Sequence, residues 1–154
     1  MIIKKLCFLG LVMAAFFALS RNAEAQFLDY KLIDPKILAR EGPLTQKDVD
    51  LLILFLNKTV EAHKAADQSL GLSQDDRRKL ATQFLKDNDF TYVRLNYVIA
   101  KVLHIVSGFD MAGTGSEAGP EPDYLVPSQT ETALIKSNID KLSAAFSLVN
   151  SAFK

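Results

Sequence analysis

The chain carries few of the side chains that bind metals or attack substrates. It has two histidines, His63 and His104, and a single cysteine, Cys7. His63 precedes Asp67 by four residues, and a pair with this spacing on a helix could offer two metal ligands on one side. A protein metal site needs three or four ligands, and no third one accompanies the pair. We therefore predict no metal site, and expect one histidine at the edge of the core and the other in solvent.

A second group of functional side chains shares one stripe of a predicted helix. Arg94, Tyr97, Lys101 and His104 follow one another at intervals of three, four and three residues. Such a stripe could face a ligand, lining a small pocket for an anion. The alternative, which we favour, is the one solvated stripe of a mostly buried helix. On that interpretation Ile99 and Val102 pack against other helices, while Lys101 reaches solvent.

Other patterns that could support catalysis or cofactor binding are incomplete. The chain has no G-x-S-x-G motif around a serine nucleophile. The glycine-rich residues 112–119 superficially resemble a phosphate-binding loop, but they follow a predicted helix, contain Glu117 and lead to Pro120. The acidic residues there, together with Asp110, could bind Ca²⁺, but the EF-hand spacing is absent. The sequence therefore predicts no catalytic residue and no cofactor-binding residue.

The central predicted element is a helix over residues 90–106. Seventeen residues without a turn signal are long for a strand and ordinary for a helix. Apolar residues occupy most of its circumference, so other elements must surround it. The apolar positions at helical spacing are Leu95, Ile99, Val102, Leu103 and Val106. This pattern predicts an all-α fold, a small domain resembling a four-helix bundle.

Capping signals place the other helices. Thr45 is expected to open a long helix that ends at Gly71, and Ser73 to open another over residues 74–86. Asp89 would then cap the central helix, although these two helices could instead be continuous. Ser128 and Glu131 form a predicted capping box at the start of one last helix, which reaches residue 153.

The remaining segments lack helical periodicity. Residues 26–44 form an apolar arm, with a short helical turn beginning at Asp34-Pro35, and we expect the arm to pack across the bundle. Residues 108–127 form a long Gly- and Pro-rich loop, which is either functional or flexible. Residues 26–154 thus constitute a single predicted domain.

The first 25 residues have the pattern of a cleavable signal peptide. Lys4 and Lys5 precede an apolar run over residues 6–19, and Ala23-Glu24-Ala25 is a cleavage signal that places the cut before Gln26. The alternative is an uncleaved anchor. A helix of 14 residues spans roughly 21 Å, less than the ~30 Å of a bilayer core. We expect a periplasmic or secreted bacterial protein with no membrane anchor after cleavage.

The charge and cysteine content of the mature chain bear on its possible partners. The full chain of 154 residues carries 18 basic and 18 acidic residues. Cleavage would remove three basic residues and one acidic residue, leaving 15 basic and 17 acidic. This balance does not suggest nucleic acid or an anionic membrane surface as a partner. The mature chain would also contain no cysteine, because Cys7 lies within the signal peptide.

Three sequence features together carry a resemblance to known proteins. They are Leu70-Gly71-Leu72-Ser73 between two helices, the helix over residues 97–106, and Leu125-Val126-Pro127 before Leu134-Ile135-Lys136-x-Asn138. Over residues 45–142 the chain resembles small, exported, all-helical bacterial proteins of uncharacterised function. The resemblance implies a helical fold and an envelope location, but no activity.

These observations favour a non-enzymatic exported helical protein that binds a protein or another cell-envelope component. The alternative is a carrier of lipids or other small apolar molecules, with a pocket between helices. The broad apolar surface of the helix that begins after Thr45 leaves this alternative open.

Overall fold

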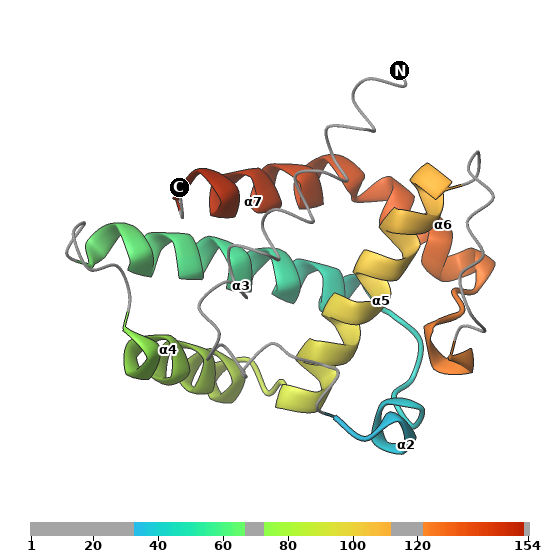
Figure 1. Cartoon of the computed structure of the whole chain (residues 1–154), viewed down its shortest axis with the longest axis horizontal. Helices are drawn as coiled ribbons and strands as arrows, with labels where there is room; N and C mark the ends of the chain where they lie inside the picture. Colours follow the sequence, from blue (N-terminus) through green and yellow to red (C-terminus); the bar gives the residue numbers. More distant parts are fainter. Residues whose placement is uncertain (1–32, 67–72, 112–121, 153–154) are drawn as a thin grey trace.

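The computed structural model describes residues 33–66, 73–111 and 122–152, and every regular element within these ranges is helical. The all-α prediction is confirmed. The elements, shown in Figure 1, are α2 (Pro35–Leu38), α3 (Gln46–Ala65), α4 (Gln74–Asp87), α5 (Tyr92–Met111), η3 (Asp123–Leu125), α6 (Gln129–Ser137) and α7 (Ile139–Ala152).

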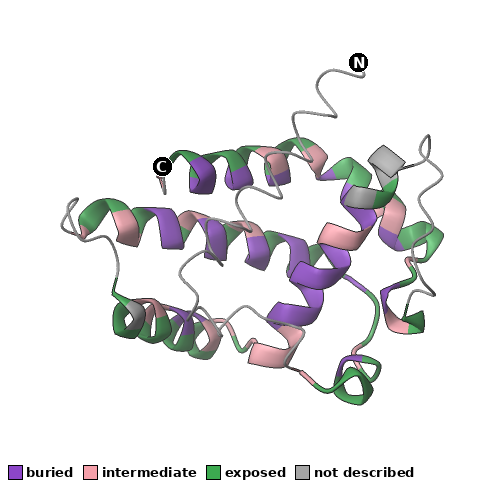
Figure 2. Ribbon diagram, in the orientation of Figure 1, coloured by how far each residue is buried: buried purple, intermediate pink, exposed green. Residues whose placement is uncertain are grey.

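Helix α3 lies between α7 and α4, and α5 crosses it obliquely (Figure 1). Helices α3 and α7 run in the same direction and form the most extensive pairing of the fold. Helix α4 contacts α3 from one side only, so most of its surface is exposed (Figure 2). Its buried residues are Ala81 and Phe84, and the Phe84 ring lies 5.2 Å from that of Phe55 between centroids.

Helix α5 is the most deeply enclosed element. All residues from 95 to 102 are buried. This run covers more than two helical turns and so includes every side of the helix. The prediction of a central, surrounded helix is therefore confirmed. Ile99 and Val102 pack in the core, as expected.

The start of α5 differs from the prediction. The Thr91 hydroxyl, not the Asp89 carboxylate, accepts a hydrogen bond from the first turn, at 3.0 Å from the Arg94 backbone nitrogen. Helix α4 ends at Asp87 and α5 begins at Tyr92, so the two helices are not continuous. The prediction of Asp89 as the cap and the alternative of one long helix are both wrong.

Asp89 instead closes the end of α4. Its φ of 49° is the one positive φ among the described non-glycine residues. The Phe90 backbone nitrogen donates to the Leu85 carbonyl at 2.9 Å, and the Asp89 nitrogen donates to the Lys86 carbonyl at 3.5 Å. These are the two bonds of a Schellman motif, in which glycine is the preferred residue at the left-handed position.

Asp89→Gly should therefore stabilise the protein by about 0.5–1 kcal/mol, because glycine adopts this backbone conformation without a steric penalty. Urea unfolding would measure the change. The control is Lys79→Gly at an exposed position inside the same helix, which should cost about 1 kcal/mol. A loss of stability in both variants would show that residue 89 does not bear this strain.

Helix α3 begins as predicted. Thr45 and Asp48 form a capping box, in which the Thr45 hydroxyl accepts from the Asp48 backbone nitrogen and the Asp48 carboxylate accepts from that of Thr45. The helix ends at Ala65, earlier than predicted, and Gly71 lies outside the described residues. The Ser73 hydroxyl caps α4, which confirms the predicted start of that helix.

The described part of the arm packs as predicted. Asp34 caps α2, and Pro35 occupies its first helical position. Leu38 and Leu44 are buried, and α2 contacts α5. Residues 26–32 of the arm lie outside the described residues.

Two predictions for the C-terminal part of the chain, the 108–127 loop and the single last helix, differ from the structure. Helix α5 continues to Met111 and η3 occupies residues 123–125, so parts of the predicted 108–127 loop are helical. Residues 112–121 lie outside the described residues. The predicted last helix is divided at Asn138 into α6 and α7.

The break at Asn138 has a local cause. Its side-chain nitrogen donates to the Leu134 carbonyl at 3.0 Å and to the Gln46 side-chain oxygen, also at 3.0 Å. The Gln46 amide donates back to Asn138 at 3.1 Å. Asparagine side chains that bond the backbone in this way compete with a continuing helix. Apolar spacing could not reveal the break, because Ile135 and Leu142 face the same core on either side of it.

Candidate functional site: a polar seam along α5

The predicted stripe lies on one side of α5. The Tyr97 ring lies between two cations, at 5.3 Å from the Arg94 guanidinium carbon and 5.6 Å from Lys101 Nζ. His104, one turn further along, is half-buried. We call Arg94, Tyr97 and Lys101, with their acidic partners Asp48 and Glu131, the polar seam.

At one end of the seam, Arg94 binds the end of the arm and the start of α3. Its Nε and Nη2 donate to the two Asp48 carboxylate oxygens at 3.0 and 2.6 Å. Nη1 donates to Glu41 at 3.3 Å and to the Gly42 carbonyl at 2.7 Å, and Nη2 donates to the Pro43 carbonyl at 2.8 Å. A guanidinium has five N–H groups, and these five contacts occupy all of them.

These contacts favour the charged forms of both partners. Burial alone would raise the pKa of Asp48, but hydrogen bonds from Arg94 and Thr45, with the Arg94 charge, outweigh it and lower that pKa below its ordinary value. Burial likewise opposes the charge on Arg94, while its bonds to Asp48 and Glu41 raise the pKa of the guanidinium. Both shifts favour the ionised pair.

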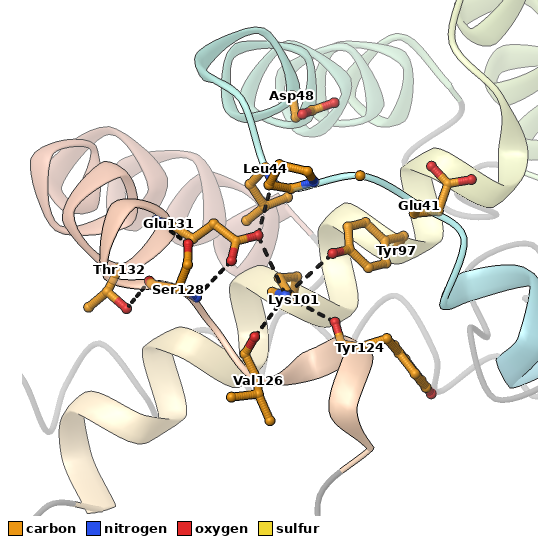
Figure 3. Close-up of polar contacts among 12 residues, drawn as sticks. Glu41, Leu44, Asp48, Tyr97, Lys101, Tyr124, Val126, Ser128, Glu131 and Thr132 are labelled. Atoms are coloured by element: carbon orange, nitrogen blue, oxygen red, sulfur yellow. Dashed lines mark hydrogen bonds and ion pairs between the residues drawn. The ribbon is translucent and has the colours of Figure 1, made fainter.

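At the other end of the seam, Lys101 is buried, contrary to the prediction that it reaches solvent. The residue is 4% exposed. Its Nζ donates to the Tyr124 carbonyl at 2.9 Å, the Val126 carbonyl at 3.1 Å and the Tyr97 hydroxyl at 3.3 Å (Figure 3). The Glu131 carboxylate lies 3.5 Å away. Two of the four partners are backbone carbonyls more than 20 residues further along the chain. No pattern of side chains in the sequence could predict them.

Glu131 joins three parts of the chain. As the predicted capping box requires, one carboxylate oxygen accepts from the Ser128 backbone nitrogen at 2.8 Å. The other oxygen accepts from the Leu44 backbone nitrogen at 3.0 Å and pairs with Lys101. Figure 3 shows the carboxylate between the arm and the segment that precedes α6. The capping role was predictable, but the contacts with Leu44 and Lys101 were not.

The same contacts shift the ionisation of Glu131. Burial alone would raise its pKa, but hydrogen bonds from Ser128 and Leu44, with the charge of Lys101, lower the pKa below the ordinary 4.5. A carboxylate with a lowered pKa in the folded state adds stability above its unfolded pKa. That stability is lost as the pH falls through the lower, folded value.

We therefore expect the free energy of unfolding to fall as the pH drops below about 4.5, the ordinary glutamate value. Urea unfolding between neutral and acid pH would measure it. Glu131→Gln should be less stable than the wild type at neutral pH and should lose less on acidification. Asp48 contributes a further acid loss in both proteins. Identical acid dependence in the two proteins would contradict the ionic role of Glu131.

The other predicted ligands are not assembled into a site. His63 is half-buried on α3, and Asp67 lies outside the described residues. Within the described ranges, no group of three or more His, Cys, Asp or Glu side chains could hold a metal ion. None of the helices in the same ranges is long and apolar enough to cross a membrane. The Gly-rich residues 112–119 are not described.

Comparison with known proteins gives no relative. No protein-family model, curated protein or solved structure matches the chain. The ligand-facing role of Arg94, Tyr97, Lys101 and His104 stays a prediction. In the structure, the first three of these residues contact protein groups along the seam.

Proposed function

We propose that the chain is an exported, non-enzymatic helical protein that binds a protein or another component of the bacterial cell envelope. Export is supported by the basic, apolar and A-x-A pattern of the first 25 residues, which lie outside the described ranges. A periplasmic or secreted location follows from that pattern.

The observation that carries the binding role is the internal use of the polar seam. Arg94 and Lys101 are the two cations of the predicted ligand-facing stripe, and both are engaged by protein groups. The described surface does carry exposed large apolar side chains on four separate segments of the chain. Those at least 40% exposed are Ile37, Leu54, Val126 and Leu148. Such side chains are suited to contact with another macromolecule.

Export makes a direct prediction about the mature chain. Material recovered from the periplasm or culture medium should begin at Gln26, because Ala23-Glu24-Ala25 fits the signal peptidase site. Intact-mass spectrometry would measure this. An Ala25→Lys variant, which places a large charged residue at the cleavage position, should remain uncleaved. A wild-type mass that retains residues 1–25 would contradict cleavage.

Native mass spectrometry of the protein purified from its own envelope tests the binding role. The proposal expects a stoichiometric complex with a second macromolecule. Val126→Ser or Leu148→Ser, or the corresponding changes at Ile37 and Leu54, should weaken the complex at the position in contact without changing stability. Lys58→Ser, at an exposed polar position on α3, is the control. A complex unaffected by all four apolar changes would contradict binding through these side chains.

The alternative function is that of a carrier of lipids or other small apolar molecules. For a carrier, native mass spectrometry should show a bound molecule of small mass and no second macromolecule. The broad apolar surface of α3 first suggested this alternative. In the structure α7, α5 and α4 all pack against that helix, so its apolar surface has a structural explanation. The partner-binding proposal is therefore the better supported of the two.

A further inference from the structure

The Lys101–Glu131 pair lies where two distant segments of the chain meet. One is the end of the arm at Leu44. The other comprises residues 122–128, which we call the strap and which contains η3. Lys101 donates to two strap carbonyls, and Glu131 accepts from the Leu44 backbone nitrogen at the end of the arm (Figure 3). Glu131 also binds the Ser128 nitrogen at the end of the strap.

Stability alone does not account for a charged pair in this position. Removing two charges from water is costly, and well-packed apolar residues are often equally stabilising or more so. A buried pair does create mutual dependence, because each charge is tolerated only while its partners exclude water. Here the partners of Lys101 come from the strap and those of Glu131 from both segments.

We propose that the pair is a clasp through which the arm and the strap dock and undock as one unit. Lifting the strap removes two acceptors from Lys101 and admits water to Glu131, which weakens its bond to Leu44. Releasing the arm removes one of the two backbone donors of Glu131 and exposes the same pair. Opening uncovers Leu44 and Leu125, both buried in the closed state, beside the already exposed Val126. The inference does not depend on the identity of any partner.

Hydrogen exchange of the intact mature protein, followed by NMR, tests the clasp. The Leu44 amide reports on the arm, and the Val126 amide, which donates to the Asp123 carbonyl, reports on the strap. In the wild type at low denaturant, both should exchange through one opening, with the same dependence on urea. Amides inside α3 and α7 should exchange only through the larger, global opening.

Lys101→Met removes the strap's anchor and leaves the direct acceptor of Leu44 in place. Coupling predicts that the Leu44 and Val126 amides both exchange roughly 10- to 100-fold faster, the effect of losing a charged hydrogen bond. Lys141→Met, at an exposed position on α7, is the control and should change neither amide. Arg94→Gln tests the coupling from the other side, because Arg94 binds the arm and has no contact with the strap. It should also accelerate hydrogen exchange at the Val126 amide.

Two results would overturn the clasp. One is faster exchange at Val126 with Leu44 unchanged, which would mean that the two segments open independently. The other is a wild-type urea dependence at Leu44 and Val126 as steep as that of the α3 and α7 amides, which would mean that both exchange only through global unfolding. If Lys101→Met does not fold, the wild-type urea dependence decides, since separate openings for Leu44 and Val126 would already refute the proposal.

Discussion

Lys101→Met should lower the free energy of unfolding by about 3–5 kcal/mol, the usual cost of removing one partner from a buried ion pair. Methionine retains most of the apolar stem, so the loss isolates the ammonium group. The substitution leaves the Glu131 carboxylate buried at 3% exposure without its counter-charge. It also leaves the Tyr124 and Val126 carbonyls without their donor. Denaturant unfolding at neutral pH would measure the change.

The same substitution at an exposed lysine is the matched control. Lys141 lies on the outer side of α7. Lys141→Met should change stability by no more than about 0.5 kcal/mol, as exposed positions usually do. Equal, small effects at Lys101 and Lys141 would show that the Lys101 ammonium is hydrated in solution, as the sequence alone suggested.

Leu142→Ala should cost about 2–5 kcal/mol, because it leaves a cavity in a core that cannot fully collapse. Leu142 is fully buried in the core, on the first turn of α7, the helix that pairs most extensively with α3. The loss is a large part of the ~5–15 kcal/mol that holds a domain of this size together. The unfolding midpoint in urea would fall accordingly, with little change in the slope of the transition.

Leu148→Ala provides the comparison within the same helix and for the same residue type. Leu148 is 46% exposed, so its truncation removes little buried area and should cost no more than about 0.5 kcal/mol. Comparable losses at Leu142 and Leu148 would contradict the orientation of α7 about its axis.

The helical fold was largely predictable from local features. The apolar spacing of α5 identified an element that is buried all round, because such spacing reflects burial directly. Thr45, Ser73 and Ser128 were recognised as caps, since a cap satisfies backbone groups only two or three residues away. These interactions are encoded within one helical turn.

The candidate site depended on contacts that no local pattern encodes. The carboxylate of Asp48 is 46 residues from Arg94, and Leu44 is 87 residues from Glu131. The partners of Lys101 include backbone carbonyls, which every residue possesses. Sequence spacing placed Arg94, Tyr97 and Lys101 on one stripe, but it could not show that protein groups cover that stripe. The Ser128–Glu131 capping box pointed to Glu131, one of the two acidic residues of the seam.

The most direct test of the buried seam is a double-mutant cycle between Lys101 and Glu131. Lys101→Met, Glu131→Leu and the double variant would be compared with the wild type by urea unfolding at neutral pH. If the pair is buried and mutually dependent, the double variant should lose about 1.5–3 kcal/mol less stability than the two single variants lose in sum. Losses that add within about 0.5 kcal/mol would show that the two side chains do not interact. That result would contradict the buried ion pair and indicate that Lys101 is exposed to solvent.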